Sequence, residues 1–409
     1  ALARRLWPNA DPIGRRLGAM DSGTAYWAEV IGVVRDVDAA TATRDPNTPY
    51  QVYKPIEQEP WSWSQIALRC RAPAGIGAEL RRAVADKVRL RTGVAYDPDR
   101  EIIITVGGKH GLSGALLALA DPGDRVLIPS PYWLSYPPMA IIAGAEPVEI
   151  DCLDNGFKLT VEKLRAHAHP RNVAIILNSP SNPTGAVYTR DEILALCEEA
   201  ARQDMWIISD EIYDRLLYDG AEFTSIPSLP GMRERTLLVN GVSKTYAMTG
   251  WRIGYVCGPA PIIKAMKTLQ SHMTSNPCAA AQQAALAALT LPEDELAAYL
   301  AGPMENLRRR RQMAADRLQR LPGLGVHPPA GAFYIMVDVR AFLGKPVGST
   351  GQPVASDEEM AWRLLDEEHI AVAAASPFGA PGFLRLSFAV PDEDLLEGIN
   401  RLAHFLHLA

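Results

Sequence analysis

Short apolar runs alternate with longer amphipathic stretches through most of the chain after residue 72. Runs such as IIITV and WIISD have the length and the β-branched content of buried strands. In the stretch 77–93, Leu80, Val84 and Val88 fall on one face of a helix. Strands that alternate with helices predict a largely parallel, doubly wound α/β sheet, which we expect to extend to about residue 290.

The strands expected in this part are short, apolar and bounded by turn residues: 101–108, 125–130, 173–178, 206–210, 236–241 and 253–258. Helices are expected at 77–93 and 109–120. A third helix should end at residue 144, and a fourth is expected at 189–204. The last of these should begin at Thr189, because Glu192 stands three positions later and completes a capping box.

The pattern changes beyond Pro292, where a long helix is expected from Glu293 to about Leu321. Short strands at 333–339, 370–375 and 383–389 then alternate with helices at 356–368 and 392–406. This pattern predicts a smaller α/β domain. The four consecutive arginines at 308–311 fit a solvated or interdomain helix face better than a nucleic-acid surface.

Residues 1–72 follow a different pattern. The basic, turn-rich segment ARRLWPNADPIGRRL precedes WAEVIGVVRDV, a predicted buried strand, and a further strand is expected within QVYKPIEQEPWSWSQIALRCR. The segment resembles a fragment of the extracytoplasmic core domain of MacB-like ABC-transporter permeases, in which LARRLWPxxDPIGRRL and EVxGVVxDV recur. We therefore predict a hybrid chain with an atypical segment at 1–72, a large domain at 73–290 and a small domain at 291–409.

Composition narrows the class of protein. The chain has 409 residues, of which 48% are hydrophobic and 22% charged, as is typical of a globular protein with two or three domains. A formal net charge of −6 argues against a nucleic-acid partner. No apolar run reaches the roughly 18 residues that span a bilayer, and the Arg-rich first residues lack the apolar core of a signal peptide. We expect no membrane association and a cytoplasmic location.

Cysteine usage agrees with that location. The five cysteines are far apart, form no CxxC pair and fit reduced, buried thiols better than a disulfide framework or a zinc site: Cys70, Cys152, Cys197, Cys257 and Cys278. No metal site is expected.

The candidate chemistry centres on 241–254, which reads GVSKTYAMTGWRIG. Lys244 follows Ser243, and Arg252 stands eight positions after the lysine. Asp210 lies at the carboxyl end of a predicted buried strand, where open α/β sheets bind ligands. Each of Lys244 and Asp210 alone is more often an exposed residue. Together they favour a pyridoxal 5′-phosphate (PLP) site.

That preference rests on the needs of the cofactor. A lysine amine forms a Schiff base with the PLP aldehyde. A carboxylate that faces the pyridine nitrogen keeps it protonated, so that the ring can withdraw electrons. The phosphate requires a guanidinium fork together with hydroxyl and backbone N–H donors. Lys244, Asp210, Arg252 and Ser243 supply these groups.

Residues 73–408 resemble the class I aminotransferases, which are fold type I PLP enzymes, and in particular the bacterial subgroup of aspartate and prephenate aminotransferases. The motifs that carry this resemblance occur in the family's order: AGIGAELRRAVADK, TVGGKHGL, PSPYWLSYP, NSPSNPTGAVY, SDEIYDRLLY, GVSKTYAMTGWRIG, PPAGAFY and FLRLSFA. The resemblance implies a PLP-dependent aminotransferase that is a homodimer with sites built from both subunits. A small-molecule amino acid and a 2-oxo acid would be its substrates.

The resemblance also implies individual roles. Lys244 would bond to the cofactor and move the substrate proton, and Asp210 would hold the pyridine nitrogen. Tyr213 and Asn182 would reach the phenolic oxygen, and Asn182 also the substrate carboxylate. Trp133 would stack on the ring. Without the resemblance, the tyrosine and tryptophan would be assigned to the core and Asn182 to a turn.

Two further groups of residues complete the predicted site. The phosphate would be held by a strand-to-helix junction and two side chains: Gly107, Gly108, Lys109, Ser243 and Arg252. Arg385 would grip the substrate α-carboxylate, and an arginine within an apolar strand independently favours an anionic partner. Lys109 is also expected to meet the distal carboxylate of an aspartate or glutamate donor, with 2-oxoglutarate as acceptor. Alternatively, Lys109 only assists the phosphate or faces solvent.

Two other functions stay open at this point. One keeps the fold and cofactor but changes the reaction, to that of a C–S lyase or a decarboxylase. The other is a catalytically impaired fusion or a transport-associated binding protein. It is suggested by residues 1–72, by the lack of the family's N-terminal arm, and by Cys70 at the position of a phosphate-binding tyrosine.

Overall fold

The computed structural model describes residues 16–21, 24–29 and 75–408. The chain divides into two compact units, Ala1–Arg69 and Cys70–Ala409. In the first unit, β1 (Arg16–Asp21) pairs antiparallel with β2 (Thr24–Glu29). The strand expected from WAEVIGVVRDV overlaps the end of β2, and its remainder lies outside the described residues, as do Cys70 and most of the transporter-like segment. The three-part division of the chain stays a prediction.

The second unit contains a seven-stranded sheet in the order β3-β9-β8-β7-β6-β4-β5. Its strands are β3 (Ile102–Val106), β4 (Arg125–Ser130), β5 (Glu146–Asp151), β6 (Asn172–Asn178), β7 (Trp206–Asp210), β8 (Thr236–Gly241) and β9 (Ile253–Cys257). Only β9 runs antiparallel to its neighbours β3 and β8, and the other paired strands are parallel. The mostly parallel α/β sheet predicted from the sequence is confirmed.

Helices cover both faces of this sheet, because successive strand residues point to opposite sides. Ile176 packs with one set of helices and Ile175 with the other. The first set comprises α3 (Gly107–Leu119), α4 (Tyr136–Ile142) and α7 (Ala260–Met273). The second set comprises α2 (Ile76–Thr92), α5 (Val161–Ala166), α6 (Arg190–Arg202) and α8 (Ala279–Leu289). The expected capping box of α6 is present at Thr189 and Glu192.

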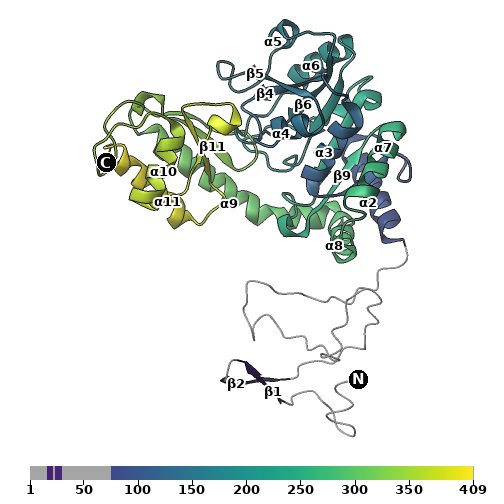
Figure 1. The fold of residues 1–409 in the computed structure, drawn as a ribbon, viewed down its shortest axis with the longest axis horizontal. Coiled ribbons are helices and arrows are strands. Elements are labelled where there is room, and N and C mark those ends of the chain that lie inside the picture. The colour runs from purple at the N-terminus through teal and green to yellow at the C-terminus, as the bar shows by residue number, and fades with distance from the viewer. Residues whose placement is uncertain (1–15, 22–23, 30–74, 409) are drawn as a thin grey trace. The chain divides into compact units, whose positions relative to one another are not determined.

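A four-stranded antiparallel sheet follows in the order β10-β11-β13-β12. Its elements are α9 (Glu293–Gln319), β10 (Gly325–His327), β11 (Tyr334–Asp338), α10 (Asp357–Glu368), β12 (Ala373–Ala374), β13 (Phe383–Ser387) and α11 (Asp392–Phe405). Figure 1 shows α9 extending from the region of α8 to the side of α11. The strand expected at 370–375 is reduced to two residues, because the chain turns into a 3₁₀ helix at Ser376–Phe378.

The sheet topology brings distant parts of the chain to one edge. The parallel strands β4, β6, β7 and β8 end at this edge, and the antiparallel β9 begins there, with Gly254 opposite Gly241. Strand β3 ends there as well, with Val106 opposite Ile253. Loops that follow these strands therefore meet at the position where open α/β sheets bind ligands.

Candidate active site

Nearly all predicted site residues lie at this carboxyl edge. Gly107, Gly108 and Lys109 begin α3 directly after β3, and Asp210 is the last residue of β7. The others stand in loops beside strand ends, except Arg385, which lies on β13 of the smaller sheet: Trp133, Asn182, Tyr213, Ser243, Lys244 and Arg252. The two sheets together thus supply one constellation of polar groups.

Asp210 is buried, with 6% of its surface exposed. The Tyr136 hydroxyl donates to its Oδ2 at 2.7 Å, and the backbone N–H of Ile212 donates to its Oδ1 at 3.3 Å. Burial raises the pKa of Asp210 to about 6, although these two donors and the charge of Lys244 act in the opposite direction. A buried carboxylate with few donors is suited to accept a hydrogen bond from a further cationic N–H.

Lys244 is half-buried, and its amine lies beside two aromatic rings. Its Nζ is 5.6 Å from the ring centroid of Tyr213 and 5.1 Å from that of Phe333. Burial lowers the pKa of Lys244, and the positive charges of Arg252 and Arg385 lower it further. A lowered pKa increases the fraction of the neutral amine, which is the nucleophilic form.

Tyr213 and Asn182 connect the central sheet with the smaller one. The hydroxyl of Tyr213 lies 3.2 Å from that of Tyr334 on β11. Burial raises the pKa of Tyr213 well above its ordinary value. The guanidinium of Arg385 donates from Nη1 to Oδ1 of Asn182 at 3.0 Å. This bond leaves the amide N–H groups of Asn182 to serve as donors toward a ligand.

Arg385 lies between two aromatic rings. Its Cζ is 4.5 Å from the ring centroid of Tyr334 and 4.8 Å from that of Phe378. Burial lowers its pKa, which is the expected cost of a guanidinium in apolar surroundings. Such an arginine is held in a fixed orientation and favours an anionic ligand.

The start of α3 and Arg252 form a narrow cradle. Gly107 has a φ of 73°, and a Cβ built there would lie 2.3 Å from Nη2 of Arg252. A Cβ on Gly254 would lie 2.5 Å from the backbone of both Gly107 and Gly108. The first backbone N–H groups of α3 have no side-chain cap. Ser243, the residue before Lys244, is buried. These amides, the guanidinium and the hydroxyl are the donors that a phosphate prefers.

Trp133 and Lys109 lie together at the rim. The amine of Lys109 is 4.8 Å from the ring centroid of Trp133, and this ring packs edge-on against Tyr136 at 5.6 Å. Lys109 is exposed, so its charge is available to a ligand that approaches from solvent. Tyr136, which packs against Trp133, also contacts Asp210 and so links the two residues.

Four aromatic residues were missed by the sequence reasoning: Tyr136, Phe333, Tyr334 and Phe378. Tyr136 and Phe333 belong to the motifs PSPYWLSYP and PPAGAFY, but an aromatic residue in an apolar stretch has the same pattern as a core residue. The one available signal was that three of them lie at the boundary of an element: Tyr136 begins α4, Phe333 precedes β11 and Tyr334 begins β11.

The chemistry of these donors fits PLP. The site combines an amine of lowered pKa, a buried carboxylate and a glycine cradle beside a guanidinium. Those three features match an aldehyde, a pyridine nitrogen and a phosphate respectively. Within 75–408 and the β1–β2 hairpin, no group of three His, Cys, Asp or Glu residues is arranged to hold a metal ion. In the same residues no helix combines the length and the apolar character needed to cross a bilayer.

Comparisons with known proteins agree with this site. The model of the aminotransferase class I and II family matches residues 72–402. The chain is 44% identical over 330 residues to an aspartate/prephenate aminotransferase of Cereibacter sphaeroides, covering 80% of this chain and 81% of that protein. It is 43% identical to an aspartate/prephenate aminotransferase of Thermus thermophilus, with 82% of each chain covered.

A solved structure shows the same fold. The aspartate aminotransferase of Rhizobium meliloti matches with a TM-score of 0.76 and 40% identity, covering 81% of this chain and 82% of that one. The match thus extends over both sheets, whose residues lie between 102 and 387.

Proposed function

The chain belongs to the family of class I and II aminotransferases, and from this we propose how its side chains divide the work of the reaction. The protein is a PLP-dependent aminotransferase, which moves an amino group from an amino acid to a 2-oxo acid. PLP, when bound, supplies an aldehyde that bonds to amines and a ring that withdraws electrons from the substrate carbon.

The cofactor would be held by residues on three sides. Asp210 would hold the pyridine nitrogen, Tyr213 and Asn182 the phenolic oxygen, and Trp133 the face of the ring. The phosphate would be held by the cradle and its neighbours: Gly107, Gly108, Lys109, Ser243 and Arg252. The observation that carries this proposal is the convergence of Lys244, Asp210 and Arg385 from separate elements on one half-buried site.

Lys244 would act twice. Its amine would hold the cofactor through the aldehyde, and its Nζ, once free, would take and return the proton of the substrate carbon. The lowered pKa of Lys244 favours the unprotonated form that can accept this proton. Tyr213 would keep the amine oriented, because its ring lies 5.6 Å from Nζ.

The substrate would be recognised at its two ends. Arg385 would bind the α-carboxylate as a fork, oriented by Asn182 and by the rings of Tyr334 and Phe378. Lys109, exposed above Trp133, would meet the distal carboxylate of an acidic donor. We therefore propose aspartate or glutamate as donor and 2-oxoglutarate as acceptor, in line with the names of the relatives.

Lys109→Ala tests this choice of substrate. The variant should lower kcat/KM for aspartate about tenfold more than kcat/KM for alanine, because both substrates share any loss at the phosphate and only aspartate also loses a partner for its distal carboxylate. An unaltered ratio of the two values would remove Lys109 from substrate recognition.

We also propose that the enzyme is a cytoplasmic homodimer. The loop that carries Arg252 is exposed in the single chain, and 44% of Trp251 beside it is accessible. The described cysteines are all free thiols, as expected in a reducing compartment, but the expectation that they are buried is wrong for Cys278, which is exposed. Light scattering of the PLP-bound protein should give twice the chain mass, whereas a fully active monomer would contradict the dimer.

The reaction itself is tested by product analysis. With PLP, aspartate and 2-oxoglutarate, the protein should form glutamate and oxaloacetate in equal amounts. A C–S lyase would release a thiol or sulfide from a sulfur-containing amino acid, and a decarboxylase would release CO₂, and neither reaction would require a 2-oxo acid as co-substrate. Products that do not depend on 2-oxoglutarate would contradict transamination, and PLP binding without products would indicate an impaired enzyme.

A further inference from the structure

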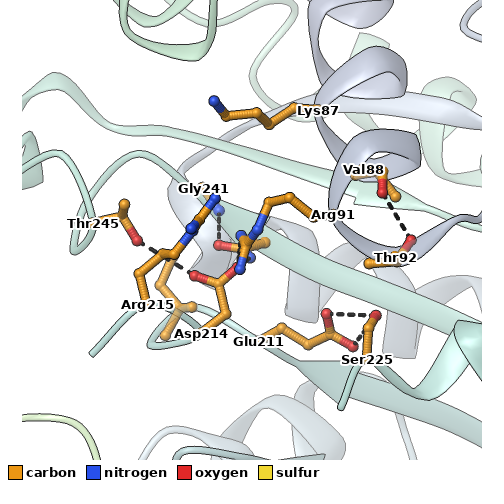
Figure 2. Close-up of polar contacts among 12 residues, drawn as sticks. Lys87, Val88, Arg91, Thr92, Glu211, Asp214, Arg215, Ser225, Gly241 and Thr245 are labelled. Atoms are coloured by element: carbon orange, nitrogen blue, oxygen red, sulfur yellow. Dashed lines mark hydrogen bonds and ion pairs between the residues drawn. The ribbon is translucent and has the colours of Figure 1, made fainter. Parts of the chain in front are cut away.

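We propose that Asp214, paired with Arg91, is a positioning residue that fixes the segment of Lys244 against the segment of Tyr213. Neither Asp214 nor Arg91 belongs to the predicted site. Both lie in a buried polar cluster formed by residues of α2, of the loop after β7 and of the loop after β8 (Figure 2). The inference rests on the proposed role of Lys244.

The carboxylate of Asp214 is 4% exposed and receives three donors from three different parts of the chain. Arg91 of α2 donates from Nη1 to Oδ2. Asn240, at the end of β8, donates from Nδ2 to the same oxygen at 2.9 Å. The hydroxyl of Thr245 reaches Oδ1 at 3.4 Å. One side chain thus joins a helix, a strand end and the lysine loop.

The sequence neighbours of these partners are the proposed catalytic residues. Asp214 directly follows Tyr213, and Thr245 directly follows Lys244. Asn240 carries the contact further, because its Oδ1 accepts the backbone N–H of Gly241 at 2.7 Å, where the lysine loop begins. The carboxylate therefore restrains the loop both before and after Lys244, relative to the residue that follows Tyr213.

The cluster has little freedom to rearrange. A Cβ on Gly241 would lie 2.7 Å from the carbonyl oxygen of Ile253, so β8 and β9 are in close contact where the loop begins. The residual cavity among Arg91, Glu211, Asp214 and Asn240 is about 10 Å³, which is room for about one water molecule. Few alternative partners are thus within reach of Asp214 if one of its donors is removed.

The charged neighbours of the pair have hydrogen-bond or ion-pair partners of their own. Glu211 is engaged by the hydroxyls of Ser209 and Ser225, each at 2.8–2.9 Å, and burial raises the pKa of Glu211 to about 7. Arg215 and Lys87 are both paired with Glu293, at 2.5 and 2.7 Å. Asp214 is therefore left to Arg91, and its negative charge raises the pKa of that guanidinium despite burial.

A purely structural ion pair would contribute only to stability, whereas a positioning residue also changes the surroundings of the lysine amine. Displacement of a reacting group by about 1 Å can cost up to 10²-fold in rate. Since Tyr213 is adjacent to Asp214 and Lys244 is adjacent to Thr245, loss of this contact should alter how the side chains of Tyr213 and Lys244 face each other. That change is visible in the cofactor spectrum as well as in turnover.

The experiment compares Asp214→Asn and Thr245→Val with Glu199→Gln in the PLP-bound protein. Glu199 is a matched control: it is 3% exposed, accepts from Arg165, Arg202 and Gln203, and lies on α6 without a contact to the lysine loop. The measurements are the melting temperature, the pH titration and circular dichroism of the visible PLP band, and kcat and KM separately.

We expect Asp214→Asn to move the pH midpoint of the visible band and to lower kcat about tenfold, with KM within about twofold. Thr245→Val should change both in the same direction by a smaller factor, and it keeps the test valid if Asp214→Asn does not fold. Glu199→Gln should lower the melting temperature without moving the band.

The inference is overturned if Asp214→Asn and Glu199→Gln, at equal loss of stability, change the pH midpoint of the band and kcat by the same amounts. It is also overturned if Thr245→Val leaves the pH midpoint and kcat unchanged. A wild-type protein that forms no PLP band would overturn the proposed function and this inference with it. If the wild-type protein forms a normal band and this band does not move in Asp214→Asn or in Thr245→Val, only the inference is overturned.

Discussion

The two halves of the site are built differently. The ring half, consisting of Asp210, Tyr136, Tyr213 and Lys244, is largely buried, and its polar groups are held by contacts within the chain. The phosphate half, consisting of Gly107, Gly108, Ser243 and Arg252, ends in the exposed segment 249–252.

This difference suggests how the functions are divided. Burial raises the pKa of Asp210 and lowers that of Lys244. Shifted pKa values of this kind are typical of catalytic groups. In the proposed site, the charged phosphate would be bound at an accessible edge, where backbone N–H groups and a guanidinium can meet it. We therefore expect changes in the ring half to affect rate and pH dependence, and changes in the phosphate half to affect PLP affinity.

The largest effect is expected for Lys244→Ala. Loss of the amine removes both the covalent link and the proton carrier, so turnover should fall by about 10⁴-fold or more. Lys264→Ala, on the exposed face of α7, is the control and should retain wild-type kcat. Steady-state kinetics with aspartate measures both. Substantial activity in Lys244→Ala would remove the lysine from its proposed role.

Arg385→Lys should give the next largest loss. Lysine keeps the charge but loses the planar fork and the stacking between Tyr334 and Phe378. We expect kcat/KM to fall about 100-fold, mostly through KM, because a bidentate carboxylate contact contributes about 2–3 kcal/mol. An equal loss for amine substrates that lack an α-carboxylate would show that Arg385 does not bind this group.

Gly107→Ala tests the phosphate half. A Cβ there meets the Arg252 guanidinium at 2.3 Å, and the positive φ of 73° adds strain. Gly93→Ala is a matched control, because Gly93 has a φ of 74° with nothing within 4 Å of its Cβ. Both should lose about 1 kcal/mol of stability, but only Gly107→Ala should weaken PLP binding, about tenfold by equilibrium dialysis. Equal PLP affinity in both variants would contradict the cradle.

Tyr136→Phe should have the smallest effect and a defined pH dependence. The hydroxyl lowers the pKa of Asp210, so its removal raises that pKa further above about 6. Because the ionised carboxylate is the active form, the acidic limb of kcat/KM should move to higher pH, and activity near pH 7 should fall about threefold to tenfold. Tyr132→Phe, which loses a 2.6 Å bond to Glu149 instead, should leave the pH profile unchanged.

Much of the fold and the site could be predicted from the sequence. The runs IIITV and WIISD are strands, and Thr189 caps α6, because periodicity and capping are local properties. The antiparallel direction of β9 could not be predicted, since an apolar run such as IGYVC has the same pattern in either direction. Residue-level roles came from the family resemblance and stay proposals.

The remaining omissions have one physical cause. Tyr136 contacts Asp210 across 74 positions, and Arg91 contacts Asp214 across 123. Such pairs depend on how helices pack on the sheet, and nothing in the local sequence around either partner indicates the other. Aromatic and basic residues on helices are usually core or surface residues, so their patterns gave no reason to select them.

The central claim is that Lys244, held in the ring half, bonds to the cofactor and takes part in amino transfer. The most direct measurement is the visible absorption spectrum of the PLP-bound protein, before and after addition of aspartate, beside the same spectra of Lys244→Ala. We predict a visible band that requires Lys244 and that converts to the amine form of the cofactor with aspartate. A band that forms without Lys244, or one that no amino acid changes, would contradict the claim.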